Sequence, residues 1–413
     1  MTQFYEKVRD RLIRYAKVDT QSRNGVSERP TTAKQFDLAR MLKAELKEIG
    51  VSEVWLDEKY CVVYGKIPAN TEGEHKALGL VAHMDTAPDA SGTNVKPWVL
   101  ENYQGQDIVL NKEKNIVMAV ADFPNLKNYI GQDLVLTDGT TLLGGDDKAS
   151  ISAIMTMAEY LCANPDIPHG DICLAFTPDE EVGGLARDLD LQRFGSPTAY
   201  TLDGDYLGYY EDETFNASAA KVTITGRSVH TGTAKGIMIN SVDIGAEFMN
   251  MLPAFEKPQY TDGREGFYHV TSFNGSCEYT EIHLIIRDHS AVEFAHREAY
   301  LQKVTDELNR KFGNVVTLEI NETYRSMKEV VDQVPYLVER LVRAISDCGV
   351  EPHDLAFRGG TDGSALSHRG LPCPNLSAGY ENAHGRFEYV PIQSMEKNVE
   401  ILLRLVQIYA EED

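Results

Sequence analysis

Short apolar runs that alternate with helical patterns are the feature that most limits the fold of this chain. A strong helical pattern, for example, covers "DKASISAIMTMAEYLCAN" at 147–164. Strands that are apolar throughout are typical of sheets buried on both faces, and interleaved helices supply the cover. The pattern therefore predicts an α/β fold with a mostly parallel, helix-covered sheet. The strongest apolar runs are "KALGLVAHMD" (76–85), "DLVLTDG" (133–139), "DICLAFT" (171–177) and "AYTLDGD" (199–205).

The pattern changes near residue 212. Strand-like segments then alternate apolar and polar residues, and two helical patterns at 241–252 and 290–312 separate them. The order β-α-β-β-α-β is typical of a small antiparallel sheet with helices on one face, as in ferredoxin-like folds. We therefore expect a smaller inserted α+β domain at 212–327. It would interrupt a larger domain made of 1–211 and 328–413.

The charge balance limits the partners of the chain. Its 413 residues contain 63 Asp and Glu against 40 Lys and Arg, a formal net charge of −23. Such a surface repels nucleic acids and anionic membranes, so we expect neither as a partner. Residues 1–18 mix charged and apolar residues at helical spacing, unlike a secretory signal. The six cysteines form no CxxC pair, which predicts free thiols and a cytoplasmic protein.

Histidines and carboxylates recur where the apolar runs end. Two of them, His83 and Asp85, are two residues apart and would face the same side of an extended segment. In open α/β sheets, ligands bind at the carboxyl ends of the strands. Imidazole and carboxylate together form the donor set for zinc, cobalt or manganese. Each residue alone could equally be a structural histidine or a helix cap. The others are Asp146, Glu180, Glu181, Asp203 and, late in the chain, His384.

These motifs resemble those of a known family. "HMDT", "GGDDKAS", "TPDEEVGG", "LDGD" and "AHG", in this order, are similar to motifs of the M20 family of dinuclear zinc peptidases. Within that family the chain most resembles the tripeptide aminopeptidases, and segments such as "GTAKGIMIN" and "RGGTDG" extend the similarity over about 80–395. The resemblance implies small peptide substrates and a monomer or homodimer. It also implies two divalent metal ions per subunit, with Zn²⁺ favoured over Co²⁺ or Mn²⁺.

The resemblance also implies roles for individual residues. Asp85 would orient the ring of His83, and Glu180 would be the general base acting on a metal-bridging water. In the family the Asp146–Asp147 peptide is typically cis. The implied metal ligands are His83 and Asp203 for one ion, Glu181 and His384 for the other, and Asp146 as the bridge.

Three further residues would contact substrate. The resemblance implies that His230, on the inserted domain, is a donor to the tetrahedral oxyanion and that Asn240 makes a polar contact. Arg358 would bind a substrate carboxylate, because its guanidinium matches a carboxylate with two parallel hydrogen bonds. From the residues alone, His230 could be a loop histidine without a contact. Arg358 could instead pair with Asp362 or cap a helix.

The function expected from the resemblance is metal-dependent release of the N-terminal residue of tripeptides. Another M20-type amidohydrolase, a dipeptidase or an N-acyl-amino-acid deacylase, would use the same metal ligands. A non-catalytic metal-binding or peptide-binding relative is a further alternative. Glu180 argues against that last alternative, since a pure binder needs no base beside a completed ligand set.

Overall fold

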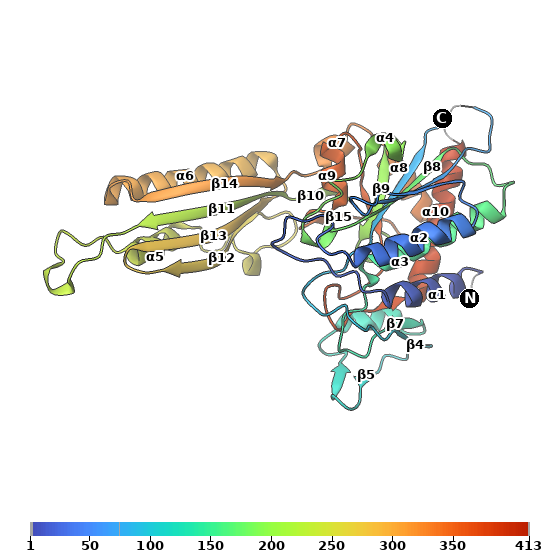
Figure 1. Cartoon of the computed structure of the whole chain (residues 1–413), viewed down its shortest axis with the longest axis horizontal. Helices are drawn as coiled ribbons and strands as arrows, with labels where there is room; N and C mark the ends of the chain where they lie inside the picture. The colour runs from blue at the N-terminus through green and yellow to red at the C-terminus, as the bar shows by residue number, and fades with distance from the viewer. Residues whose placement is uncertain (1–2, 74, 412–413) are drawn as a thin grey trace. The chain divides into compact units, whose positions relative to one another are not determined.

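The computed structural model describes residues 3–73 and 75–411, which form two compact units (Figure 1). Unit 1 contains the described residues up to Asp212 together with Glu329–Leu355 and those from Thr361 onward. Unit 2 contains Glu213–Lys328 and Ala356–Gly360. None of the helices in the described ranges has the length and apolar character that crossing a membrane requires.

Unit 1 is built on an eight-stranded sheet in the order β1-β2-β8-β3-β9-β16-β10-β15. Its central strands β8, β3, β9 and β16 are parallel, whereas β1, β2 and β10 pair antiparallel. The α/β prediction is confirmed, but the sheet is mixed. One reason is that β1 and β2 are joined by a short connection, which permits only antiparallel pairing. The strands are β1 Glu53–Leu56, β2 Val63–Ile67, β3 Leu78–His83, β8 Ile172–Thr177, β9 Ala199–Gly204, β10 Tyr209–Thr214, β15 His353–Phe357 and β16 Asn375–Ser377.

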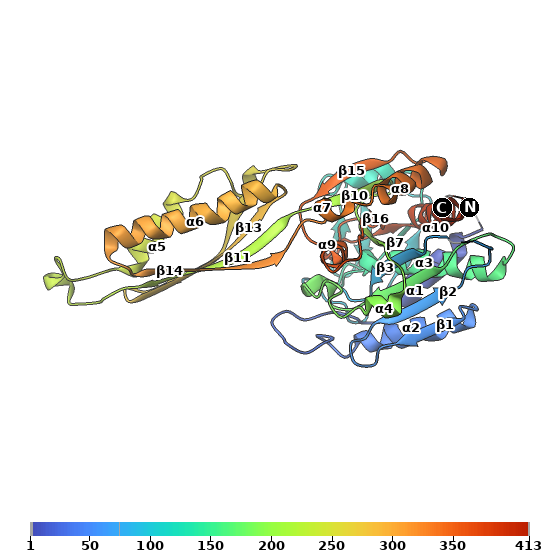
Figure 2. The same cartoon turned by 90° about the horizontal axis from the view of Figure 1, so that it is seen from above.

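Helices and loops cover both faces of this sheet (Figures 1 and 2). Along each central strand the side chains alternate between two hydrophobic clusters, because successive residues point to opposite faces. Leu80 and Phe176 belong to the cluster under α1, α3 and α10, whereas Val81 and Ala175 pack with Phe194 of α4 and Leu366 of α9. The helices are α1 Tyr5–Ala16, α2 Gln35–Glu48, α3 Gly145–Ala163, α4 Leu191–Phe194, α7 Lys328–Val331, α8 Tyr336–Asp347, α9 Asp362–His368 and α10 Ile392–Glu411.

The parallel pairing brings three strand ends to one edge of the sheet. His83 ends β3 opposite Thr177, which ends β8, and β9 on the other side of β3 ends at Gly204. A second sheet of three strands, in the order β17-β7-β4, and a hairpin of β5 and β6 complete unit 1. These strands are β4 Trp98–Leu100, β5 Ile108–Asn111, β6 Ile116–Met118, β7 Leu134–Leu136 and β17 Val390–Pro391.

Unit 2 contains a four-stranded antiparallel sheet in the order β12-β13-β11-β14. The chain order β11-α5-β12-β13-α6-β14 and this strand order are those of the ferredoxin-like topology predicted above. Figure 2 shows α5 and α6 on the same side of the sheet, where Phe248 and Phe294 enter its hydrophobic core. The elements are α5 Ser241–Met251, α6 Ala291–Phe312, β11 Asn216–Thr225, β12 Phe267–Gly275, β13 Tyr279–Asp288 and β14 Val316–Tyr324.

Candidate metal centre

Asp146 lies between two histidines that are 301 positions apart in the chain. Its Oδ1 is 3.0 Å from Nε2 of His83, and its Oδ2 is 3.1 Å from Nε2 of His384. The backbone at Asp146 is extended (φ −76°, ψ 104°) rather than helical, and the Asp146–Asp147 peptide is cis, as the resemblance implies. By these two distances each carboxylate oxygen faces a different imidazole, which is the arrangement that a bridging ligand between two ions requires.

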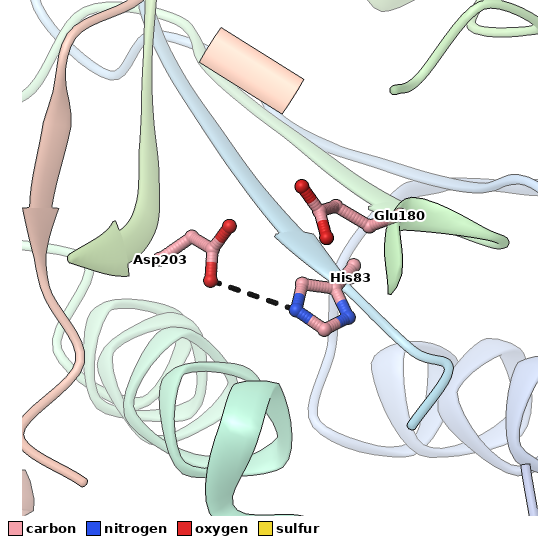
Figure 3. A group of neighbouring side chains, drawn as sticks. All are labelled: His83, Glu180 and Asp203. Atoms are coloured by element: carbon pink, nitrogen blue, oxygen red, sulfur yellow. Dashed lines mark ion pairs between the residues drawn. The ribbon is translucent and has the colours of Figure 1, made fainter. Parts of the chain in front are cut away.

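Two groups of donor atoms lie at this site, and Asp146 belongs to the second. His83, Glu180 and Asp203 offer ligand atoms that all lie within 4.8 Å of one another, and so do His83, Asp146 and Glu181. Figure 3 shows the first group, in which Oδ1 of Asp203 is 3.5 Å from Nε2 of His83. The geometry alone would therefore allow Glu180 to act as a ligand beside His83 and Asp203.

The two adjacent glutamates face different partners. Oε2 of Glu181 is 2.8 Å from Nε2 of His384, and Glu181 groups with His83 and Asp146, whereas Glu180 groups with His83 and Asp203. The turn that presents them begins after Asp179 (φ 64°) and closes at Gly183 (φ 76°). Because consecutive side chains diverge, the pair can serve two positions of the site.

Two buried carboxylates, those of Asp85 and Asp147, hold the strand that ends at His83 and the turn of Glu180 and Glu181 in place. The carboxylate of Asp85 accepts the N–H groups of Glu180 and Glu181 at 2.9 and 3.2 Å. The Oδ1 of Asp85 is also 3.4 Å from Nδ1 of His83. Asp147 accepts the backbone N–H of His83 at 3.1 Å, a contact that the sequence analysis missed. Asp147 follows a predicted ligand directly, but nothing in the pattern distinguishes it from a helix cap.

Burial and mutual repulsion raise the pKa values of three carboxylates of the site. Burial raises the pKa of Glu181 to about 8, and the charge of Asp146 adds to this effect. Burial also raises the pKa of Glu180 well above its usual range, with Asp203 contributing next. The pKa of Asp203 is raised mainly by burial, although a hydrogen bond with His83 opposes the shift. In the metal-free protein these acids resist ionising together.

The two histidines lower the pKa of Asp146 instead. Burial alone would raise the pKa of Asp146, but hydrogen bonds with His384 and His83 hold it well below its usual range. Burial lowers the pKa of His83, yet the carboxylates of Asp146 and Asp203 raise it well above its usual value. Positive charge is therefore favoured at the positions of the two imidazoles, between the acids.

A cation pair fits this donor set. A buried oxygen of the second group, Oε1 of Glu181, has no hydrogen-bond partner among the described residues. An unpaired buried acceptor is costly, and bound cations would satisfy such oxygens and neutralise the clustered carboxylates. Imidazole with carboxylate oxygen is a donor set for zinc, cobalt or manganese.

The three predicted substrate residues lie in unit 2. Nδ1 of His230 accepts the N–H of Gly232 at 3.1 Å, and Oδ1 of Asn240 accepts the N–H of Val242 as the N-cap of α5. Arg358 donates from Nη1 to the carbonyls of Gly263 and Glu265 and from Nη2 to Thr261 Oγ1. Its guanidinium also stacks over the rings of Phe215 and Phe267. Arg358 is thus anchored within unit 2, while its Nε has no hydrogen-bond partner in the described ranges.

Comparison with known proteins identifies the family. Peptidase T of Clostridium novyi (strain NT) is 48% identical over 406 residues, which cover 98% of this chain and 100% of that protein. The chain belongs to the peptidase T family. A family profile described as a peptidase dimerisation domain also matches residues 212–316.

Solved structures share the fold over almost the whole chain. A tripeptidase from Staphylococcus aureus superposes with a TM-score of 0.78 at 20% identity, covering 99% of both chains. A dinuclear metal-binding peptidase of the M20 family from Bacillus subtilis superposes with a TM-score of 0.68 at 10% identity, again covering 99% of both. With its membership of the peptidase T family, the chain is a metal-dependent peptidase, a hydrolase of the aminopeptidase class.

Proposed function

We propose that this enzyme is a two-metal aminopeptidase that releases the N-terminal residue of tripeptides. The observation that carries the proposal is the position of Asp146, whose two carboxylate oxygens each contact a different histidine. His83 and Asp203 would hold one ion, Glu181 and His384 the other, and Asp146 would contact both. When bound, two divalent ions lower the pKa of a water molecule and polarise the peptide carbonyl.

Glu180 is the proposed general base. Its carboxylate lies beside His83 and Asp203. In the proposed assignment each ion already has two ligands of its own and shares Asp146, which leaves Glu180 for proton transfer. Burial and the charge of Asp203 raise the pKa of Glu180, which suits a group that takes a proton and then passes it on. We propose that Glu180 accepts a proton from the attacking water and delivers it to the leaving amine of the peptide.

Two residues of unit 2 are proposed to bind the substrate. Because Nδ1 of His230 accepts a hydrogen bond, the neutral ring carries its proton on Nε2 and can donate it to a developing oxyanion. Arg358 is held by the carbonyls of Gly263 and Glu265 and by Oγ1 of Thr261, which leaves its Nε–H and one Nη2–H for a substrate carboxylate. Asn240 is proposed to add a polar contact through its amide nitrogen, since its oxygen caps α5.

The experiment that tests this function compares peptide classes on one purified sample. The enzyme, reconstituted with zinc, cobalt or manganese, is offered free di-, tri- and tetrapeptides and N-acetyl amino acids. We expect the first residue to be released from tripeptides, and released faster than from shorter or longer peptides. Hydrolysis of N-acetyl amino acids but not of free tripeptides would contradict the proposal and favour a deacylase. If wild-type protein cleaves nothing with any of the three metals, a non-catalytic binder is favoured.

We also propose that the enzyme forms a homodimer in the cytoplasm. The dimerisation-domain profile matches 212–316, nearly all of unit 2, and this supports assembly through that unit. All six cysteines are free thiols, which agrees with a reducing compartment. Light scattering coupled to gel filtration would give the mass of the assembly, and a mass near 46.0 kDa, that of one chain, would contradict the dimer.

A further inference from the structure

Glu388 is a buried carboxylate that receives three backbone N–H groups from a single turn. Its Oε2 accepts the N–H groups of Leu143 and Gly144 at 2.8 and 2.7 Å, and its Oε1 accepts that of Asp146 at 2.9 Å. Only 2% of the residue is exposed to solvent. All three partners are donors, so both oxygens of Glu388 act as acceptors.

The turn that Glu388 binds is shaped to admit it. Gly144 adopts a left-handed conformation (φ 76°) that other residues rarely adopt. A Cβ atom on Gly145 would collide with Val390 and lie 3.1 Å from Oε1 of Glu388. The "LLGG" segment before Asp146 therefore leaves the space that the Glu388 carboxylate occupies.

Glu388 also belongs to the loop that carries His384. The N–H of Glu388 donates to the carbonyl of Gly385 at 3.3 Å, and Tyr389 exchanges two backbone hydrogen bonds with Glu381. His384 therefore lies within a loop that is closed at residues 381 and 389. Glu388 joins this loop to the Asp146 turn, and the two segments are more than 200 positions apart in the chain.

We propose that Glu388 is a positioning residue that holds Asp146 and His384 in their metal-binding arrangement before any ion binds. The inference rests on the proposed function, because it concerns the same pair of metal sites. Its physical basis is that one carboxylate fixes the backbone of Asp146 and the loop of His384 together. The ligands then lose less conformational freedom when an ion binds, and outer partners of metal ligands typically change metal affinity 10–100-fold.

The test is metal affinity of the apoprotein, measured with zinc by competition against a chromogenic chelator. Glu388→Gln retains the shape of the side chain but points its amide N–H₂ group at the backbone N–H donors of the turn. We therefore expect zinc to bind about 10–100-fold more weakly. The matched control is Glu45→Gln on α2. Glu45 is another buried glutamate, and its carboxylate accepts hydrogen bonds from Nε–H of Arg11 at 2.8 Å and from the hydroxyl of Tyr15 at 2.7 Å. This control should lower thermal stability and leave zinc affinity unchanged. Equal zinc affinity of wild type and Glu388→Gln, or an equal loss in the control, would overturn the inference.

Two further measurements keep the test decisive if Glu388→Gln does not fold. Gly145→Ala keeps the carboxylate but pushes the turn away from it, and should also weaken zinc binding at least tenfold. In wild-type apoprotein, the amides of Leu143, Gly144 and Asp146 should exchange hydrogen slowly; rapid exchange that slows only after zinc is added would overturn the inference. Wild-type protein that binds no zinc, cobalt or manganese would instead reject the proposed function itself.

Discussion

The backbone N–H of Glu180 donates to Oδ1 of Asp85 at 2.9 Å, so the proposed base is held by the residue two positions after His83, a proposed metal ligand. The neighbouring N–H of Glu181 donates to the other oxygen at 3.2 Å. Asp85 is fully buried. One carboxylate thus sets the direction of both glutamates relative to the strand that carries His83.

We predict that Asp85→Asn slows turnover about 10–100-fold, the usual effect of losing an outer partner of metal ligands. The asparagine amide would face one of the two N–H donors, so the turn of Glu180 and Glu181 would shift. Steady-state kinetics on a tripeptide at saturating metal would measure this, with kcat falling more than KM rises. Asp89→Asn, at an exposed position on the same loop, should behave like wild type. Unchanged kcat in Asp85→Asn would show that the turn does not depend on this carboxylate.

Glu180→Gln separates the roles of the two adjacent glutamates. Losing a general base typically slows the reaction about 10²–10⁴-fold, while the ligands of both proposed ions remain. We therefore expect turnover to fall by that factor with two metal ions per chain retained, as measured by elemental analysis of the dialysed protein. The companion variant Glu181→Gln should lose metal as well as activity. If Glu180→Gln loses metal, Glu180 is a ligand and the two assignments must be exchanged.

Much of the fold and of the site follows from local sequence patterns. The continuous apolar runs ending at His83, Thr177 and Gly204 predicted parallel strands, and parallel strands end at the same edge. For this reason the positions of His83, Asp203 and the glutamate turn near one another could be expected. The inserted unit could be predicted because its strands alternate apolar and polar residues, whereas the strands of the central sheet are apolar throughout.

Other features have no signal in a single sequence. Asp147 and Glu388 act through backbone N–H groups of distant segments, and such contacts depend on tertiary structure alone. The antiparallel strands at the edges of the large sheet could not be placed from the sequence. The length of a connection predicts whether two successive strands pair antiparallel, but it does not predict the order of the strands in the sheet. The anchoring of Arg358 by Gly263 and Glu265 could not be read from "RGGTDG", because the partners lie more than 90 positions away.

Removing the metal should destabilise the protein as well as inactivate it. The clustered carboxylates around Asp146 would lose their counter-charges, and a ligand present at 100 times its Kd stabilises the folded state by about 2.7 kcal/mol. We expect dialysis against a chelator to abolish peptide cleavage and lower the melting temperature, and added zinc, cobalt or manganese to restore both. Asp203→Asn, which removes one proposed ligand, should weaken the response to added metal. Full activity and an unchanged melting temperature after chelation would contradict a metal-dependent mechanism.

Unit 2 contains a buried histidine whose protonation should control its stability. His289 is 6% exposed, and its ring stacks on that of Phe215 with 4.2 Å between centroids. Burial lowers the pKa of His289, and the guanidinium groups of Arg264 and Arg358 act in the same direction, while Glu213 opposes them. The folded state therefore favours the neutral ring.

Acidification should consequently destabilise unit 2. In the unfolded chain His289 takes up a proton near pH 6.5, whereas in the folded protein it does so only at lower pH, so stability falls as the pH drops below about 6.5. One proton can account for at most about 1.4 kcal/mol per pH unit. Thermal unfolding between pH 5 and 8 should show a steeper loss for wild type than for His289→Gln, which cannot titrate. His296→Gln, at an exposed position on α6, should retain the wild-type slope. If stability falls with pH at the same rate in wild type and His289→Gln, other groups are responsible for the acid sensitivity of unit 2.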